Sequence, residues 1–225
     1  QCPFIATAHH AGDQLETVLM RLMRGSGPRG LAGIPPKRLL RTGSGALLTI
    51  VRPMLAAPRS FSRGICTALP TPWREDPTNL DRGPVRNELR ARVTPEIERM
   101  CPTIAARLDA TCASLRAAAD LIAGEAQHLL LHANEPAPGR AELPTAMLLR
   151  AVPAVRAEAI RLLYYRATGL RGDRLPARTV DRIAAAILAQ PSHPREFAIR
   201  SARVRMSARS VGIERTTPIV PLTEP

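Results

Sequence analysis

Hydrophobic residues near the start of the chain change from a strand-like run to a helical period. The apolar run over residues 2–8 predicts a short buried strand, which leads directly into His9 and His10. From Asp13 onward, apolar positions recur at helical spacing and define one face of an amphipathic helix: Leu15, Val18, Leu19, Leu22 and Met23. Gly25 is expected to end this helix at the C′ position.

The pattern then predicts a second strand followed by helices. The expected elements are a strand over residues 46–51, a helix over 59–69, a turn-rich segment over 70–84 and a helix from 84 or 85. Thr94 is expected to be the N-cap of the next helix, because Pro95 and an acidic residue follow it.

Helical pattern dominates the second half of the chain. The expected elements are a helix to about residue 132 with a boundary at Pro102, a Pro/Gly linker over 134–142, helices over 145–167 and 179–189, and short strands beyond Pro194. The polar residues that suit chemistry therefore fall within residues 1–95, and the rest of the chain is mainly helical.

Composition adds a strong positive charge. The 225 residues carry 32 basic and 19 acidic side chains, a formal net charge of +13, and Lys37 is the only lysine. Such a surface favours a polyanion such as nucleic acid, although an arginine-rich composition is equally typical of a GC-rich genome. Aromatic residues make up 3%, too few for a base-stacking platform, so a nucleic-acid contact would depend on charge and shape. Both sides of residue 97 are basic, with 14 basic against 7 acidic residues before it and 18 against 12 after it.

The four cysteines are scattered singly. No C-x-x-C pair occurs, which argues against a zinc knuckle, an iron–sulfur cluster or a dithiol redox site and predicts a reduced, cytoplasmic chain. No apolar run approaches the roughly 18 to 20 residues that a membrane span needs, and no signal peptide is visible. We therefore expect no membrane partner.

The densest polar cluster lies over residues 9–17, where the first strand meets the first helix. Ligands of open α/β sheets bind at such a junction. Asp13 and Glu16 also have the D-x-x-E spacing of a capping box, which taken alone favours a structural role. A capping box does not require His9 and His10 beside it, so both interpretations stay open.

Residues 25–30 match G-x-G-x-x-G but in the wrong context. A dinucleotide fingerprint follows a strand and opens a helix, whereas these glycines follow a helix and precede a loop. The dinucleotide interpretation therefore fails. Residues 26–33 are expected to form a plain loop after the helix, with an arginine-bearing flap over a ligand as the alternative.

A second polar cluster spans residues 76–90. An Asx-turn at 76–79 followed by an exposed basic helix is the structural interpretation. Arg86 and Arg90 lie four residues apart on one helix face, which also suits two adjacent phosphates. Farther along, Glu125, His128 and His132 share a helix face, but without a fourth ligand this spacing usually marks a solvated surface.

Five motifs in this order and spacing resemble the tRNA(Ile)-lysidine synthase family of N-type ATP-pyrophosphatases, or PP-loop enzymes. They are A-H-H-x-x-D-Q-x-E-T at residues 8–17, R-G-S-G-x-x-G-L at 24–31, R-P-M-L at 52–55, W-x-x-D-P-T-N at 73–79 and R-N-x-L-R at 86–90. The resemblance is specific over residues 1–97 and more diffuse in the helical part after it.

The resemblance implies an α/β fold. Residues 1–97 would be the C-terminal part of a Rossmann-like, adenine nucleotide alpha hydrolase-like parallel-sheet catalytic domain. Residues 98–225 would be a mainly α-helical, tRNA-contacting domain with short strands near its end. The implied reaction is ATP-dependent ligation of free L-lysine to the wobble cytidine of the CAU-anticodon tRNA(Ile), through an adenylated tRNA, with Mg²⁺ as a cofactor; a homodimer is allowed.

The resemblance also implies roles for individual residues. A lysine ammonium must be held by carboxylates and must lose a proton before it attacks, and Arg forks suit phosphates. The expected site residues are Asp13, Glu16 and His10 for catalysis, Asp13 and Glu16 for lysine, His9, His10 and Arg86 for ATP, and Arg24, Arg29, Arg52, Asn79, Asn87 and Arg90 for tRNA. No metal ligands are expected.

Two features depart from the family pattern. Gly12 stands at a position that is usually acidic, which weakens the case for magnesium or lysine binding there. The S-G-G-x-D-S phosphate loop belongs before residue 1 and does not occur in the chain, so we expect an N-terminally truncated fragment. The alternatives are a catalytically inactive, basic tRNA-binding fragment and a tRNA thiolase of the same superfamily, although thiolases generally use paired cysteines.

Overall fold

A computed structural model describes residues 2–43, 45–69, 85–169, 175–190, 193–199 and 201–216, without the side chains of 62 and 63. The chain divides into two compact units, Gln1–Ala119 and Asp120–Pro225. The first unit thus continues past residue 97, where the sequence predicts a domain boundary. The division falls within a long helix.

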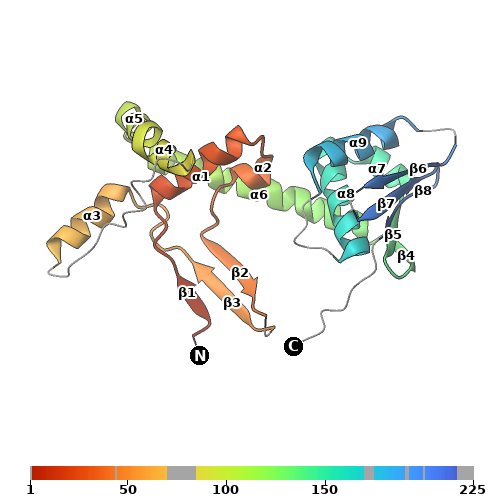
Figure 1. The fold of residues 1–225 in the computed structure, drawn as a ribbon, viewed down its shortest axis with the longest axis horizontal. Helices are drawn as coiled ribbons and strands as arrows, with labels where there is room; N and C mark the ends of the chain where they lie inside the picture. Colours follow the sequence, from red (N-terminus) through yellow and green to blue (C-terminus); the bar gives the residue numbers. More distant parts are fainter. Residues whose placement is uncertain are drawn as a thin grey trace. The chain divides into compact units, whose positions relative to one another are not determined.

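The first unit combines a small sheet with helices (Figure 1). Its elements are β1 (Phe4–Ala6), α1 (Ala11–Met23), α2 (Pro28–Leu31), β2 (Lys37–Arg41), β3 (Leu47–Val51), α3 (Arg59–Ala68), α4 (Val85–Glu88), the π-helix η2 (Leu89–Val93), α5 (Thr94–Met100) and the first part of α6 (Ile104–Leu130). The strands predicted at 2–8 and 46–51 and the helix predicted at 59–69 are confirmed within a few residues. The prediction that the first strand is buried is wrong, because every residue of β1 is exposed.

The sheet of the first unit has the strand order β1-β3-β2. β1 and β3 are parallel, with Ile5 opposite Ile50, which confirms the expected parallel pairing. A parallel pair needs a crossover connection, and the chain between β1 and β3 contains α1. β2 is antiparallel to β3, with Leu39 opposite Thr49, and was not predicted because its sequence K-R-L-L-R has no alternating pattern.

Both ends of α1 are closed by local hydrogen bonds. Gly25 has φ +69° and its N–H donates to the Leu22 carbonyl, while the Ser26 N–H donates to the Arg21 carbonyl. These two bonds form a Schellman motif, so the predicted end of the helix is confirmed. At the other end the N-cap is His10, three residues before the predicted start of the helical period at Asp13.

The helices after residue 84 begin as predicted but continue differently. Thr94 is not an N-cap, because Val93 before it is already helical (φ −86°, ψ −49°) and η2 runs directly into α5. The helical signal of the preceding residues outweighs the local cap signal there. The predicted boundary at Pro102 is confirmed, since α5 ends at Met100 and α6 starts at Ile104. None of the helices that the structure describes is long and apolar enough to cross a bilayer.

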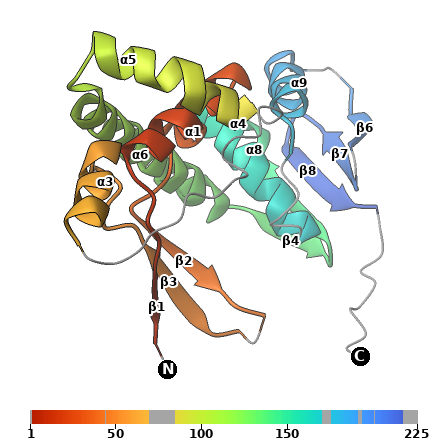
Figure 2. The same ribbon diagram turned by 60° about the vertical axis from the view of Figure 1, so that its left-hand side comes forward.

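The second unit is built on an antiparallel sheet (Figure 2). Its remaining elements are β4 (Asn134–Ala137), β5 (Arg140–Pro144), α7 (Thr145–Arg150), α8 (Pro153–Thr168), α9 (Ala177–Leu188), β6 (Arg195–Ile199), β7 (Ala202–Met206) and β8 (Ser210–Arg215), with the strand order β4-β5-β8-β7-β6. The predicted linker over 134–142 is wrong, because it forms the β4–β5 hairpin around Gly139, whose φ is +77°. The strands predicted beyond Pro194 are confirmed.

The second unit has a continuous apolar core. α8 packs against β5 and β8, and the largest fully buried side chains include Leu163, Tyr164, Ile183 and Ile213. Buried Arg156 has no carboxylate partner among the described residues and instead donates to the carbonyls at the end of α7: Leu148, Leu149 and Ala151. It thus satisfies helix-end acceptors that would otherwise lack partners.

Candidate functional site

The end of the parallel strands brings three segments together. The Thr7 N–H donates to the Val51 carbonyl, 3.0 Å away, and the Ala11 N–H donates to the Ala57 carbonyl, also 3.0 Å away. The segment after β3 therefore lies beside the start of α1. This is the carboxyl edge of β1 and β3, where open α/β sheets bind ligands.

Glu16 is the buried centre of an ion cluster at this edge. Glu16 is 1% exposed. Each of its two carboxylate oxygens accepts a hydrogen bond from Nε of an arginine, one on α4 and one on η2. The distances are 2.8 Å from Arg86 Nε to Oε2 and 2.8 Å from Arg90 Nε to Oε1. Arg90 Nη2 also donates to Oε2 at 3.0 Å. Both oxygens of this carboxylate are thus taken up by guanidinium groups.

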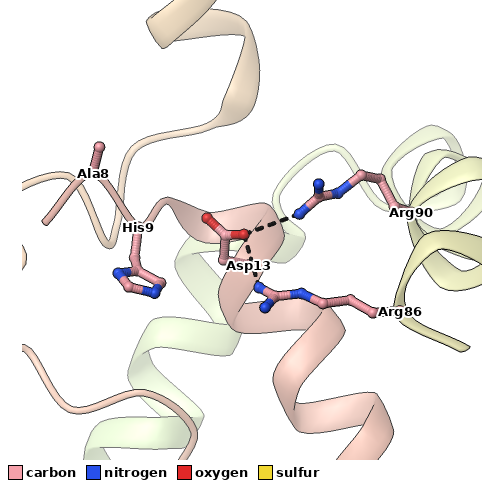
Figure 3. A pocket seen from close by; sticks show the side chains of 5 residues that line it. All are labelled: Ala8, His9, Asp13, Arg86 and Arg90. Carbon is pink, nitrogen blue, oxygen red and sulfur yellow. Dashed lines mark hydrogen bonds and ion pairs between the residues drawn. The ribbon is translucent and has the colours of Figure 1, made fainter. Parts of the chain in front are cut away.

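Asp13 lies one turn before Glu16 on α1 and joins the same cluster. Its Oδ1 accepts from Arg86 Nη2 at 2.9 Å and from Arg90 Nη2 at 3.2 Å (Figure 3). Two carboxylates therefore face two guanidiniums from a segment 70 to 77 residues away in the chain. Hydrogen bonding to Glu16 raises the pKa of Arg90 above its usual value, although burial opposes this. The guanidinium charge is therefore permanent.

An open pocket of about 310 Å³ adjoins the cluster, and its lining residues are Ala8, His9, Asp13, Arg86 and Arg90. Figure 3 shows the two arginines on one side of the Asp13 carboxylate and the His9 ring on the other. The volume falls within the range of small-molecule sites. Glu16 does not line the pocket, so Asp13 is the carboxylate that a ligand would meet.

The two adjacent histidines have different roles. His9 lines the pocket, and its Nδ1 lies 2.9 Å from Thr7 Oγ1, which orients the ring. His10 is the N-cap of α1: its Nδ1 accepts from the N–H groups of Gly12 (3.0 Å) and Asp13 (3.3 Å). The cap thus occupies Nδ1 of His10, and Nε2 is the ring nitrogen left for another partner.

The capping box of α1 is thus formed by other residues than the sequence suggests. Asp13 Oδ2 accepts from the His10 N–H at 3.0 Å, which makes His10 and Asp13 the reciprocal pair. The box with Asp13 as N-cap and Glu16 as its partner is wrong, because Glu16 lies inside the helix and binds arginines. Proton transfer through His10 Nδ1 would break this cap, so His9 is the better placed of the two histidines for acid–base work.

Comparison with known proteins agrees with this geometry. Residues 1–97 match the sequence model of the PP-loop domain. The match covers 97 of the 225 residues. The chain is also similar to proteins named tRNA(Ile)-lysidine synthase, and the resemblance seen in its five motifs is confirmed, together with the expected fold class.

Three of these relatives show the extent of the similarity. The protein from Pseudomonas putida is 36% identical over 172 residues, which cover 75% of this chain and 39% of the relative. That from Salinispora tropica is 36% identical over 185 residues, 81% of this chain and 53% of the relative. That from Symbiobacterium thermophilum is 46% identical over 112 residues, 49% of this chain and 22% of the relative. The chain thus spans about a fifth to about a half of the length of these relatives.

The glycine-rich segment over residues 25–33 is anchored to α1. Arg21 Nη1 donates to the carbonyls of Gly30 and Gly33 at 2.7 Å each. Gln14 Oε1 accepts from the Ile34 N–H at 2.6 Å, and Gly33 has φ +67°, with Gln14 where a Cβ would lie. The prediction of a plain loop over 26–33 is wrong in part, because residues 28–31 form the short helix α2, and the anchoring of this segment to α1 argues against a flap. Sequence reasoning assigned no role to Arg21 or Gln14, although Gln14 lies within the A-H-H-x-x-D-Q motif.

Of the described residues that were predicted to contact tRNA, only Arg90 lines the pocket. Arg24 and Arg29 are exposed at the end of α1 and on α2. Arg52 donates through Nη1 to the Pro35 carbonyl at 2.7 Å. Asn87 is half-buried on α4, and Asn79 lies outside the described residues.

No group of three or more His, Cys, Asp or Glu side chains that could hold a metal ion occurs in the described parts of the chain. Glu125, His128 and His132 are all exposed near the end of α6. Asp13 and Glu16 are the acidic pair at the pocket, and three of their four oxygens accept from arginine while the fourth accepts from a backbone N–H. These donors do not form a magnesium site in this arrangement.

Proposed function

We propose that the protein containing this chain uses ATP to ligate free lysine to the wobble cytidine of the CAU-anticodon tRNA(Ile), forming lysidine. The carrying observation is the pocket on which Asp13, Arg86, Arg90 and His9 converge, in a domain that matches the PP-loop family and relatives named for this product. The reaction has two steps. The base carbonyl oxygen attacks ATP and releases pyrophosphate, and the lysine ε-amine then displaces AMP.

Asp13 is proposed as the main contact of the lysine substrate. It lines the pocket, and a lysine ammonium bound to it would replace one of the guanidinium N–H groups that now share Oδ1. Glu16 lies beneath it and contributes negative charge that attracts the ammonium. The ammonium must lose a proton before the nitrogen can attack, and His9 is placed to accept it.

Arg86 and Arg90 are proposed to bind phosphate groups of ATP. Their side chains are 39% and 21% exposed, so part of each guanidinium faces the pocket while the rest is fixed by the carboxylates. An arginine whose orientation is fixed by buried carboxylates is preorganised for an anion. The match to the PP-loop domain supports ATP as the nucleotide.

Other features of the reaction follow from the resemblance and stay predictions. Mg²⁺ is expected, but the carboxylates at the pocket do not form a site for it, and no step above depends on a protein-held ion. The net charge of +13 supports a tRNA substrate. We place the protein in the cytoplasm and allow a homodimer.

The test is a tRNA-dependent assay of AMP release and lysine incorporation with the protein that contains this chain. Asp13→Asn should lower lysine incorporation at least about 100-fold, because it removes the pocket's anionic charge, while tRNA affinity stays within about twofold. Asp120→Asn, the same change at an exposed position on α6, is the matched control and should behave as wild type.

The outcomes separate the proposal from its rivals. AMP release that does not depend on lysine would contradict lysidine synthesis. tRNA binding without AMP release would favour a catalytically inactive binding module. A thiolase is not favoured, since all four cysteines are free thiols and no two of them are close in the sequence. Loss of tRNA binding in Asp13→Asn would show that Asp13 is only a structural cap.

A further inference from the structure

The hairpin of β2 and β3 carries positive charge without any acidic neighbour in the sequence. Between Glu16 and Glu75 the chain has 10 basic residues and no acidic one. Three of these cations, Lys37, Arg38 and Arg41, lie on β2, where every residue is exposed. Among the described residues, none of these three cations forms an ion pair with a carboxylate.

Strand register places two of the arginines on the same face. Arg38 pairs with Ile50, and the Arg52 N–H donates to the Pro36 carbonyl, which extends the ladder by one step. Arg52 is therefore opposite Pro36 and lies on the same face of the sheet. Because side chains of a strand alternate between faces, Arg38, two residues after Pro36, lies on that face as well. Lys37 lies on the opposite face. Burial, and then the charge of Arg38, lower the pKa of Arg52, as expected for neighbouring cations.

One nitrogen of the Arg52 guanidinium is held by a hydrogen bond, and another has no partner among the described residues. Its Nη1 donates to the Pro35 carbonyl at 2.7 Å, which holds the guanidinium in place. Its Nε is buried and has no hydrogen-bond partner among the described residues. Arg38 and Arg52 have no carboxylate partner among the described residues, so their positive charges repel each other. An anion bound between the two guanidiniums would remove this repulsion.

The pair lies at the same end of the sheet as the pocket. Lys37 at the start of β2 pairs with Val51 at the end of β3, and the Val51 carbonyl accepts from Thr7, two residues before His9. Figure 1 shows the start of β2 at the end of the sheet where β1 and β3 lead into the helices. An extended polyanion that places one nucleotide in the pocket can therefore continue along β2.

We propose that Arg38 and Arg52 form a binding site for a backbone phosphate of the RNA substrate. The inference rests on the proposed function for the identity of the RNA. RNA is favoured over ATP because Arg38 lies on a fully exposed strand, the pocket is lined by other residues, and the basic stretch is too extensive for one nucleotide. Guanidinium pairs match phosphate oxygens in geometry as well as in charge.

The experiment compares tRNA binding by Arg38→Gln and Lys37→Gln over a salt titration. Both variants remove one positive charge from neighbouring exposed positions, but only Arg38 faces Arg52. Arg38→Gln should weaken binding about three- to tenfold and reduce the slope of log K against log salt concentration by about 0.7 to 0.9, one phosphate contact. Lys37→Gln should change affinity by less than about twofold.

Three outcomes would overturn the inference. Equal losses in the two variants would mean that only total charge matters, and unchanged tRNA binding in Arg38→Gln would mean that no phosphate binds there. Weaker ATP binding with normal tRNA binding would assign the arginine pair to the nucleotide. The test is separable from the lysidine assay: a protein that binds tRNA through Arg38 without forming lysidine would contradict only the proposed function.

Discussion

The two units are stabilised in different ways. In the second, the described residues form one continuous apolar cluster that includes Leu163, Tyr164 and Ile213, and its ion pairs are partly exposed. In the part of the first unit that the structure describes, few apolar side chains are buried, and the bulky ones among them are Leu15, Leu55 and Leu89. Glu16, the most buried acidic residue of that described part, is held by arginines.

The first unit buries charged side chains beside the candidate site, whereas the second unit buries mainly apolar ones. A buried ion pair must compensate the desolvation of both charges, so it is a weaker source of stability than apolar packing of the same volume. The first unit also leaves apolar residues of its sheet exposed, such as Phe4 at 57% and Leu39 at 63%. We therefore expect the first unit to unfold before the second, and the predictions below test this.

The largest effect is expected in the core of the second unit. Leu163→Ala should lower the free energy of unfolding by about 3–5 kcal/mol, because Leu163 is fully buried, whereas Leu15→Ala should cost about 2 kcal/mol in the smaller core. Leu131→Ala, at an 80% exposed position, is the control and should stay within about 0.5 kcal/mol. Denaturant unfolding followed by hydrogen exchange measures each unit separately. Equal costs for Leu163 and Leu15 would contradict the contrast.

Breaking the ion cluster should have the next largest effect. Glu16→Gln should destabilise the first unit by about 2–3 kcal/mol, since it leaves two guanidiniums facing a neutral amide. The full cost of an unpaired buried charge is not expected, because Arg86 is 39% exposed and can be rehydrated. A double-mutant cycle with Arg90→Gln measures the coupling. A coupling near zero would mean that the cluster does not form in solution.

The helix cap should contribute less. His10→Ala removes the acceptor of the Gly12 and Asp13 N–H groups and should cost about 1 kcal/mol. His10→Asn should recover stability to within a few tenths of a kcal/mol, because asparagine is a strong N-cap residue. Thermal unfolding of both variants is the measurement. If asparagine were no better than alanine, His10 would act otherwise than as a cap.

The last prediction needs no substitution and concerns the reactivity of the cysteine thiols. Burial raises the pKa of the Cys112 thiol, so the reactive thiolate is scarcer at neutral pH than for an exposed cysteine. Maleimide should therefore label the exposed Cys2 and Cys66 first and Cys112 only when the first unit opens. Its labelling rate, compared with hydrogen exchange in α8, shows which unit opens more often. Rapid labelling of native Cys112 would contradict the packing described.

Local signals predicted several elements well. The period of α1 and its end at Gly25 depend on residues within one or two turns, and both are confirmed. The boundary at Pro102 is of the same kind. Where local signals conflicted, the sequence was a poor guide. The Thr94 cap was overridden by the helix before it, and the Pro/Gly-rich 134–142 segment became a hairpin because β8 pairs with β5.

The candidate site was predictable in its membership but not in its pairing. The motifs brought Asp13, Glu16, Arg86 and His9 forward as chemically important, and the structure places all four in or beside the pocket. They were assigned to separate ligands, however, whereas the carboxylates and guanidiniums bind one another. The sequence could not show that His9 lines the pocket while His10 caps α1, because the two residues are identical neighbours.

The amino-acid sequence alone determined the period of the helices, the excess of positive charge and the order of the motifs, because each depends on residues close along the chain. Tertiary structure alone decided that Arg86 and Arg90 meet Glu16, and that Arg52 shares a face with Arg38. Such contacts join residues far apart or on different strands. They form because packing and strand register bring the backbones together, and charge then selects the partners.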